Sequence, residues 1–368
     1  MVAWVAAAAV IGPFASADRA RAADRLILRN LDFVLDRTVV EIDEDGVRLD
    51  AALPGGGDRL TWDRIERGTV ALDQERFDKL LAELGLPLYR IRQRLRVGDY
   101  AALAEPAEAV YPRLSGRRSP TAFMVCQAVV WSRLAAGRRE AAVEPYVRLC
   151  ELVRSNPGWM ADLPGERRMT IDPATALSNE LTPIWFDAQA AAAALGGVEQ
   201  AIRGMTQPRP AGIYVYYATL ALTAGQPEEA DRVLGALVSD DRLAQWRSVV
   251  LAQREVLAGR PDAALATLLE QRGELTEACR PAALYWLGRG QLLSTDPMTV
   301  SGGLLDLLTL PAEYASRDRE LAAAGLYEAA AALDKLKDAR GAAALRQELA
   351  RQYGGTYHAN LLAQRAAP

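Results

Sequence analysis

A motif that repeats every 34 residues constrains the fold of this chain more than any other feature of the sequence. Residues 223–234 read TAGQPEEADRVL, and residues 257–268 read LAGRPDAALATL. Gly225 and Gly259 are 34 positions apart, and the proline, alanine and leucine that follow each glycine keep the same offset. A fixed period of this length indicates a repeat architecture, in which each unit buries its apolar face against its neighbours. The sequence therefore predicts stacked pairs of helices.

Each position of the repeat has a physical role. A small residue seven positions before the glycine lets the first helix of a pair approach the second. The glycine ends the first helix in the left-handed conformation, and proline suits the first turn of the second helix, where no amide donor is lost. Another small residue follows inside the second helix. The residues that we assign to these structural positions are Ala218, Gly225, Ala230, Ala252, Gly259, Ala264 and, in a looser copy, Gly288.

This helix–glycine–helix unit resembles the tetratricopeptide repeat. The resemblance covers roughly residues 75–365 and implies an α-solenoid whose first helices line a concave groove for a peptide or a partner helix. Aromatic and arginine side chains there would anchor the partner. The alternative is that the aromatic residues pack between neighbouring pairs of helices. The groove positions map onto Trp246, Gln253, Tyr285, Arg289 and Tyr327.

The first part of the chain has a different character. Apolar and polar residues alternate with a period of two between residues 25 and 70, which predicts short strands. Asp45-Gly46 lies between two such runs and predicts a hairpin turn, since glycine tolerates the positive φ of a tight turn. The pattern resembles the small Sm-like and Src-homology-like barrels of bacterial envelope proteins. We expect a small β-barrel-like unit ahead of the helices.

The organisation that we expect is a mainly α protein with an exported N-terminus. Val2 to Ala17 form an apolar run that is followed by small residues, which is typical of a signal peptide cleaved near Ala22. The run is too short for a good membrane span, although a cytosolic N-terminal helix is the alternative. The expected segments are a signal peptide (1–22), a small β domain (23–72), helical hairpins (73–155), an irregular insertion (156–182) and tetratricopeptide-like repeats (183–368).

Composition excludes several classes of function. The 43 basic and 47 acidic residues give a net charge of −4, which argues against a dedicated nucleic-acid-binding protein. A single histidine and three cysteines leave little material for a metal site or a histidine-based triad. We therefore expect no metal and no cofactor. His358, close to the end of the chain, is expected at the surface or in end-cap packing.

The cysteines allow one covalent cross-link. Cys126 and Cys150 lie on consecutive predicted helices that are joined near Gly137, so they are expected at the same height in an antiparallel hairpin. An exported protein could oxidise such a pair to a disulfide. The alternative is two small buried residues in contact, both reduced. Cys279 is expected to be buried, and it is left as a free thiol if the disulfide forms.

The function that we expect is a non-catalytic scaffold or adaptor of the bacterial cell envelope, soluble in the periplasm and bound to another protein or peptide. One alternative is an envelope enzyme, for instance a glycan-acting hydrolase, with carboxylates in the groove or the insertion; a pair of buried acids facing one cavity would favour it. Another alternative is a purely structural subunit of an envelope complex, which an apolar patch on the convex face would favour.

Overall fold

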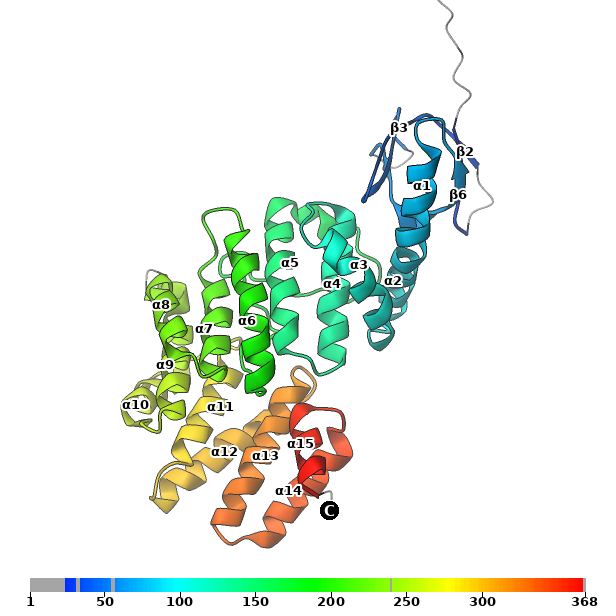
Figure 1. The fold of residues 1–368 in the computed structure, drawn as a ribbon. Coiled ribbons are helices and arrows are strands. Elements are labelled where there is room, and N and C mark those ends of the chain that lie inside the picture. The colour runs from blue at the N-terminus through cyan, green and yellow to red at the C-terminus, as the bar shows by residue number, and fades with distance from the viewer. Residues whose placement is uncertain (1–23, 31–33, 54–56, 239, 367–368) are drawn as a thin grey trace, which may run out of the picture. The chain divides into compact units, whose positions relative to one another are not determined.

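The computed structural model describes residues 24–30, 34–53, 57–238 and 240–366 of the chain. The protein is mainly α-helical, as expected, and divides into two compact units, Met1–Gly85 and Leu86–Pro368 (Figure 1). The signal peptide expected over residues 1–22 lies outside the described residues. Within the described part of the chain, no helix combines the length and the apolar character that a membrane crossing requires.

The first unit is built on two small antiparallel sheets, with strand orders β2-β1-β6 and β3-β4-β5. The turn expected at Asp45-Gly46 joins β3 to β4. Gly46 has a φ of 140°, and a Cβ atom there would lie 2.1 Å from the carbonyl oxygen of Leu60, so only glycine fits. The strands are β1 (Arg25–Leu28), β2 (Val34–Asp36), β3 (Val39–Asp43), β4 (Gly46–Leu49), β5 (Arg59–Leu60) and β6 (Ile65–Thr69).

A helix completes the core of this unit. Helix α1 (Gln74–Leu80) and the π-helical turn η2 (Leu81–Gly85) follow β6 directly. The buried ring of Phe77 meets Trp62 edge-on, with 5.4 Å between centroids. The sequence placed the end of the β domain at residue 72, whereas the compact unit continues to Gly85, because the apolar face of α1 is needed to cover the strands.

The second unit is a succession of helices in which most helices pack mainly against the one before and the one after, while α9 also packs against α7 and α11, and α15 against α13 (Figure 1). The irregular stretch after α5 is the one long interruption among the described residues. The helices are α2 (Leu86–Val97), α3 (Ala104–Leu114), α4 (Pro120–Ala135), α5 (Val143–Ser155), α6 (Ala188–Arg203), α7 (Gly212–Thr223), α8 (Pro227–Val238), α9 (Ala244–Leu257), α10 (Asp262–Gln271), α11 (Arg280–Gln291), α12 (Pro297–Glu313), α13 (Arg319–Lys335), α14 (Ala339–Gln352) and α15 (Tyr357–Ala366).

In several pairs of helices, the first helix ends in the same way. Gly225 and Gly259 have φ values of 73° and 71°, and the amide after each donates to a carbonyl five residues back. This is the Schellman motif, which satisfies carbonyls that a helix end leaves open. Gly98 and Gly137 end α2 and α4 in the same conformation, and Lys337 adopts it after α13 without the freedom of a glycine.

Small residues lie where helices approach closely. Ala218, Ala230 and Ala252 are fully buried, whereas Ala264 is half-buried. Gly288 in α11 faces α12, and a Cβ atom there would lie 2.6 Å from a side-chain carbon of Leu307. The alternation of small residues therefore sets the spacing between the helices of a pair.

The irregular residues 161–187, which we call the crossing segment, lie over α4, α5 and α7. Its side chains Leu181, Ile184 and Trp185 are buried. Trp185 Nε1 donates to the hydroxyl of Thr219 on α7 at 2.9 Å, and three further bonds join helix side chains to the backbone of the segment. These bonds run from Gln127 Nε2 to the Arg167 carbonyl (3.3 Å), from the Tyr146 hydroxyl to the Ala176 carbonyl (2.7 Å) and from the Ser178 amide to the Tyr216 hydroxyl (3.0 Å).

A buried ion pair closes the second unit on itself. Arg139, in the turn after α4, makes two parallel bonds of 3.0 and 2.8 Å to Asp318, which lies 179 residues later and caps the start of α13. The same guanidinium donates to the carbonyls of Thr182 and Ile184 in the crossing segment. One arginine thus joins the early helices, the crossing segment and the late helices.

Candidate functional site

A pocket of about 340 Å³ lies between α11, α13, α15 and the end of the crossing segment, with α7 and α9 at its rim. We call it the aromatic pocket, because rings dominate its lining. An aromatic lining with few polar groups is typical of ligand sites. Its rings are those of Trp185, Phe186, Tyr285, Trp286, Tyr327, Tyr357 and His358.

Three of the five groove residues expected from the sequence lie together in this pocket: Tyr285, Arg289 and Tyr327. The other two do not line it. Trp246 is buried in α9, and Gln253 donates from Nε2 to the Thr219 carbonyl and to the hydroxyl of Thr223, both at 3.0 Å. Gln253 therefore holds α9 against α7. At these two positions the side chains pack between neighbouring helices, as in the alternative to a groove.

Arg289 is the central cation of the pocket. Its guanidinium lies 5.8 Å from the ring centroid of Tyr285 and 5.5 Å from that of Trp286. Its Nε is 3.2 Å from a carboxylate oxygen of Glu328. The neighbouring Tyr285 and Glu328 raise the pKa of Arg289 against the opposing effect of burial. The pocket thus holds a fixed, partly neutralised positive charge among rings.

His358 lies deep in this pocket rather than at the surface. Its ring centroid is 4.7 Å from that of Phe186 and 5.0 Å from that of Tyr327. Burial, together with the charge of Arg289, lowers the pKa of His358 to about 3. General acid–base catalysis works best when the pKa lies near the working pH. A histidine that stays neutral at pH 7 fits a hydrogen-bonding role better than a catalytic one.

Sequence reasoning missed His358 and Phe186. A weak signal for the C-terminal contribution exists, because Tyr357, His358, Leu361 and Arg365 form one stripe on α15 at helical spacing. Phe186 offers no comparable local signal, since it belongs to an irregular segment. Its place in the pocket depends on the bonds that hold the crossing segment.

Two polar groups in the pocket residues have no partner. Trp286 and His358 are 2% and 5% exposed, and neither Trp286 Nε1 nor His358 Nδ1 has a hydrogen bond to any described residue. Buried polar groups in proteins are nearly always bonded, so each exception calls for an explanation. Both atoms are inaccessible to solvent, and similar unpartnered atoms occur on α4, at Gln127 Oε1 and Trp131 Nε1.

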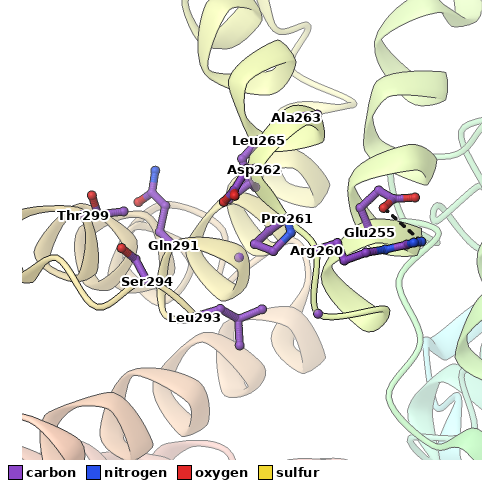
Figure 2. Close-up of a pocket in the computed structure, with 12 residues that line it drawn as sticks. Glu255, Arg260, Pro261, Asp262, Ala263, Leu265, Gln291, Leu293, Ser294 and Thr299 are labelled. Carbon is purple, nitrogen blue, oxygen red and sulfur yellow. Dashed lines mark ion pairs between the residues drawn. The ribbon is translucent and has the colours of Figure 1, made fainter.

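A larger cleft of about 970 Å³ lies between the turn after α9 and the turn after α11. We call it the turn cleft. Figure 2 shows Glu255 and Arg260 facing each other across its edge as an ion pair, with Gln291 and Ser294 on the other side. Of the described residues that line it, none is aromatic. The turn cleft therefore has no large anchor and is the weaker candidate.

A third cavity, of about 520 Å³, tests the enzyme alternative because the acids Glu108, Glu140 and Glu144 line it. Each acid has a partner of its own. Glu140 accepts hydrogen bonds from the backbone amides of Phe186 and Asp187 at 2.9 and 3.2 Å. Glu144 accepts a hydrogen bond from the Tyr111 hydroxyl at 2.6 Å. A two-bonded pair with Arg133 lowers the pKa of Glu108.

The carboxylates of these acids are therefore engaged in structural hydrogen bonds. Burial does raise the pKa of Glu320 to about 7, but Glu320 is not among the residues that line this cavity. Its carboxylate accepts the amide of Tyr357 at 3.0 Å at the start of α15. Within the described residues, no cluster of three histidine, cysteine or acidic side chains could hold a metal ion.

The disulfide considered between Cys126 and Cys150 is not formed, and all three cysteines are buried free thiols. The reason is the direction of the side chains. Cys126 lies near Glu144 and Arg148, whereas Cys150 lies beside Tyr146, on the opposite face of α5. Burial raises the pKa of both thiols to about 12, so they are inert.

Comparisons with known proteins identify no relative of this chain. No family model matches it, and neither a curated protein nor a solved structure matches it. What the protein does is therefore inferred from its own residues.

Proposed function

We propose that this chain is an exported, tetratricopeptide-like α-solenoid that acts as a non-catalytic scaffold or adaptor of the bacterial cell envelope. It binds a partner protein through the aromatic pocket. The observation that carries this proposal is the pocket itself, which combines aromatic rings with a central arginine. Buried aromatic and arginine side chains are the usual anchors of protein interfaces.

The helical packing supports the solenoid part of the proposal. Neighbouring helices pack in chain order, and α7 and α9 end in the same left-handed glycine with a 34-residue offset. Residues of the first helices α7, α9, α11 and α13 line the aromatic pocket, which is where a helical-hairpin repeat would present its groove.

The crossing segment supports the location of the site. It covers α4, α5 and α7 with the chain's own backbone, so these helices are already occupied. Helices α11 and α13 are not covered in this way, and the aromatic pocket lies there. A partner segment would thus lie over α11 and α13 as the crossing segment lies over α4, α5 and α7.

The proposal is tested by photo-crosslinking in the full chain. Leu257 lines the aromatic pocket and is 47% exposed, and Leu293 lines the turn cleft and is 51% exposed. Each is replaced in turn by the photoreactive residue p-benzoylphenylalanine, and the protein is irradiated in native envelope extract. We expect one dominant protein to crosslink at position 257 and not at position 293.

Tyr327→Ala is then introduced into the protein that carries the photoreactive residue at position 257. It should abolish the crosslinked product, because it removes a wall of the pocket. Equal products at both positions, or no product at position 257, would count against a binding role for the aromatic pocket. Retention of a product after Tyr327→Ala would count against it as well.

A further inference from the structure

We propose, resting on the function proposed above, that the cavity of about 520 Å³ binds a lysine or arginine side chain of the partner protein. We call it the acidic cavity, because four acids and only two arginines line it. It lies between α3, α4, α5, α6 and the start of α15. The structural hydrogen bonds of its acids leave some of the carboxylate oxygens unused.

Two of the four acids receive no cation from the chain. Both arginines of the lining pair with Glu108, and Glu144 pairs with Arg148. Glu140 and Asp187 form no ion pair with any residue that the structure describes. Even with Arg148 counted, the acids of the cavity outnumber its arginines. The acidic cavity therefore keeps a negative charge that a cation from outside the chain would neutralise.

Glu140 is the buried acid of the two, with an exposed fraction of 4%. Its Oε1 accepts the backbone amides of Phe186 and Asp187. Its Oε2 bonds no described residue and, unlike Trp286 Nε1, is not closed off from solvent. Buried charged groups are seldom found without a group of opposite charge. A carboxylate oxygen that is open to a cavity and has no cation points to a positively charged ligand.

Two further oxygens beside Glu140 are free to accept a hydrogen bond. Asp187 uses Oδ1 to cap α6 through the amides of Gln189 and Ala190, and its Oδ2 bonds no described residue. The Tyr357 hydroxyl also bonds none of them. Burial, followed by the charges of Asp187 and Glu140, raises the pKa of Tyr357, so this hydroxyl lies near both acids.

A protonated amine or guanidinium suits these oxygens. An ammonium group carries three donors and a guanidinium five, and neither group accepts. The ring of Tyr357 offers a face to the same cation, and the apolar stem of a long basic side chain would lie along Ala193 and Ala194 of α6. A metal ion is not favoured, because the described residues include no cluster of three possible ligands.

The acidic cavity adjoins the aromatic pocket, which identifies the source of the cation. Tyr357 lines both, and Asp187 of the acidic cavity directly follows Phe186 of the aromatic pocket. The rings of Phe186 and Tyr357 stack, with 6.4 Å between their centroids. A partner segment that is anchored in the aromatic pocket therefore passes beside the acidic cavity, where a long basic side chain of the same segment can enter.

The test begins with a displayed library of random twelve-residue peptides, selected on the full chain. Peptides that bind the aromatic pocket are recognised by their loss of binding to Tyr327→Ala. We expect these peptides to share a lysine or an arginine, and a second selection on Glu140→Gln should no longer enrich basic residues. Pocket-binding peptides without a basic residue would overturn the acidic cavity and leave the proposed function standing. A selection without pocket-binding peptides would overturn it as well, whereas the crosslink at position 257 decides the proposed function separately.

The affinity of one enriched peptide is then measured by titration calorimetry. Glutamine at position 140 keeps an acceptor for the two backbone amides, so Glu140→Gln removes the charge with little change of shape. Replacing the basic residue of the peptide by norleucine should weaken binding to the unchanged chain by about tenfold or more, and binding to Glu140→Gln by about threefold or less. Equal losses with the two proteins would mean that the basic residue and Glu140 do not interact, which would overturn the inference.

Asp187→Asn repeats this measurement at the second acid, and circular dichroism checks that each variant folds. Asparagine caps a helix as well as aspartate does, so the start of α6 is kept while the charge is lost. The dependence of affinity on the basic residue of the peptide should fall. Asp338→Asn is the matched control, because Asp338 caps α14 from an exposed position outside the acidic cavity. An equal fall in the control would overturn the role of Asp187.

Discussion

Two faces of the helical unit differ in how their polar groups are satisfied. On α4, α5 and α7, the side chains of Gln127, Tyr146 and Tyr216 all bond backbone groups of the crossing segment. On α11 and α15, Trp286 Nε1 and His358 Nδ1 bond no described residue. Gln127 Oε1 and Trp131 Nε1 on α4 are also unpartnered, so the two faces differ in their cover and not in the presence of such atoms. We call the face on α4, α5 and α7, to which the crossing segment is bonded, the completed face.

The strongest way to break this comparison is to release the completed face. Arg139→Met would leave the carboxylate of Asp318, 3% exposed, as a buried charge without its partner. Loss of one member of a buried ion pair typically costs about 3–5 kcal/mol. We expect a decrease of that size in the free energy of unfolding, measured with urea.

Arg138→Met is the matched control for that change. Arg138 is half exposed and pairs with Glu108 at the surface, so its loss should cost less than about 1 kcal/mol. Similar losses in the two variants would mean that the Arg139–Asp318 pair does not secure the completed face.

A second test concerns Glu320, whose folded pKa of about 7 lies above the ordinary value of 4.5. The folded state therefore binds this proton more tightly than the unfolded state, and stability falls as pH rises from about 4.5 to 7. Glu320→Gln should remove a pH-dependent loss of up to about 3 kcal/mol, measured by urea unfolding at pH 5 and pH 8. Glu313→Gln, at the exposed end of α12, should leave the pH dependence unchanged.

The third test concerns a loss of stability as pH falls rather than as it rises. His358 has a folded pKa of about 3, below the ordinary 6.5, so the unfolded state takes up its proton first and stability falls as pH drops below 6.5. The expected loss is about 2 kcal/mol between pH 6.5 and 5, and His358→Asn should remove it. Because the chain has one histidine, its imidazole gives a single set of NMR signals. Titration of those signals near pH 6.5 would contradict a buried neutral ring.

The smallest expected effect compares two buried glutamines. Gln253 donates two hydrogen bonds from Nε2 to α7, whereas the Gln291 side chain at the turn cleft bonds no described residue; the Oε1 atoms of both are unpartnered. Gln253→Met should cost about 1–2 kcal/mol, and Gln291→Met should change stability by less than about 1 kcal/mol in either direction. Thermal unfolding of both variants measures the difference. Equal costs would show that the two hydrogen bonds of Gln253 do not stabilise the fold.

The helices and their ends could be predicted from the sequence because the signals are local. Gly225 and Gly259 end helices through their own conformational freedom, and their 34-residue spacing identifies the pairs. The same local logic ended the first unit too early, since the need for Phe77 to cover the sheets does not appear in a period-two pattern.

The candidate site was only partly predictable, for a physical reason. Tyr285, Arg289 and Tyr327 follow from their positions in the repeat, so helical spacing finds them. Phe186 and His358 enter the same pocket through contacts between distant parts of the chain, which no local pattern contains. Trp246 and Gln253 occupy equivalent repeat positions, yet neighbouring helices cover them.

The bond between Arg139 and Asp318 also bears on how the chain folds. A linear array of repeats gains stability unit by unit, and its ends can fray or be shortened without destroying the middle. Here a contact across 179 residues couples helices near the start of the second unit to helices near its end. The helices of the second unit should therefore melt in one cooperative transition, and deletion of its terminal helices should destabilise the others. Closure over so long a loop also slows folding, because the ends must meet before the contact is gained.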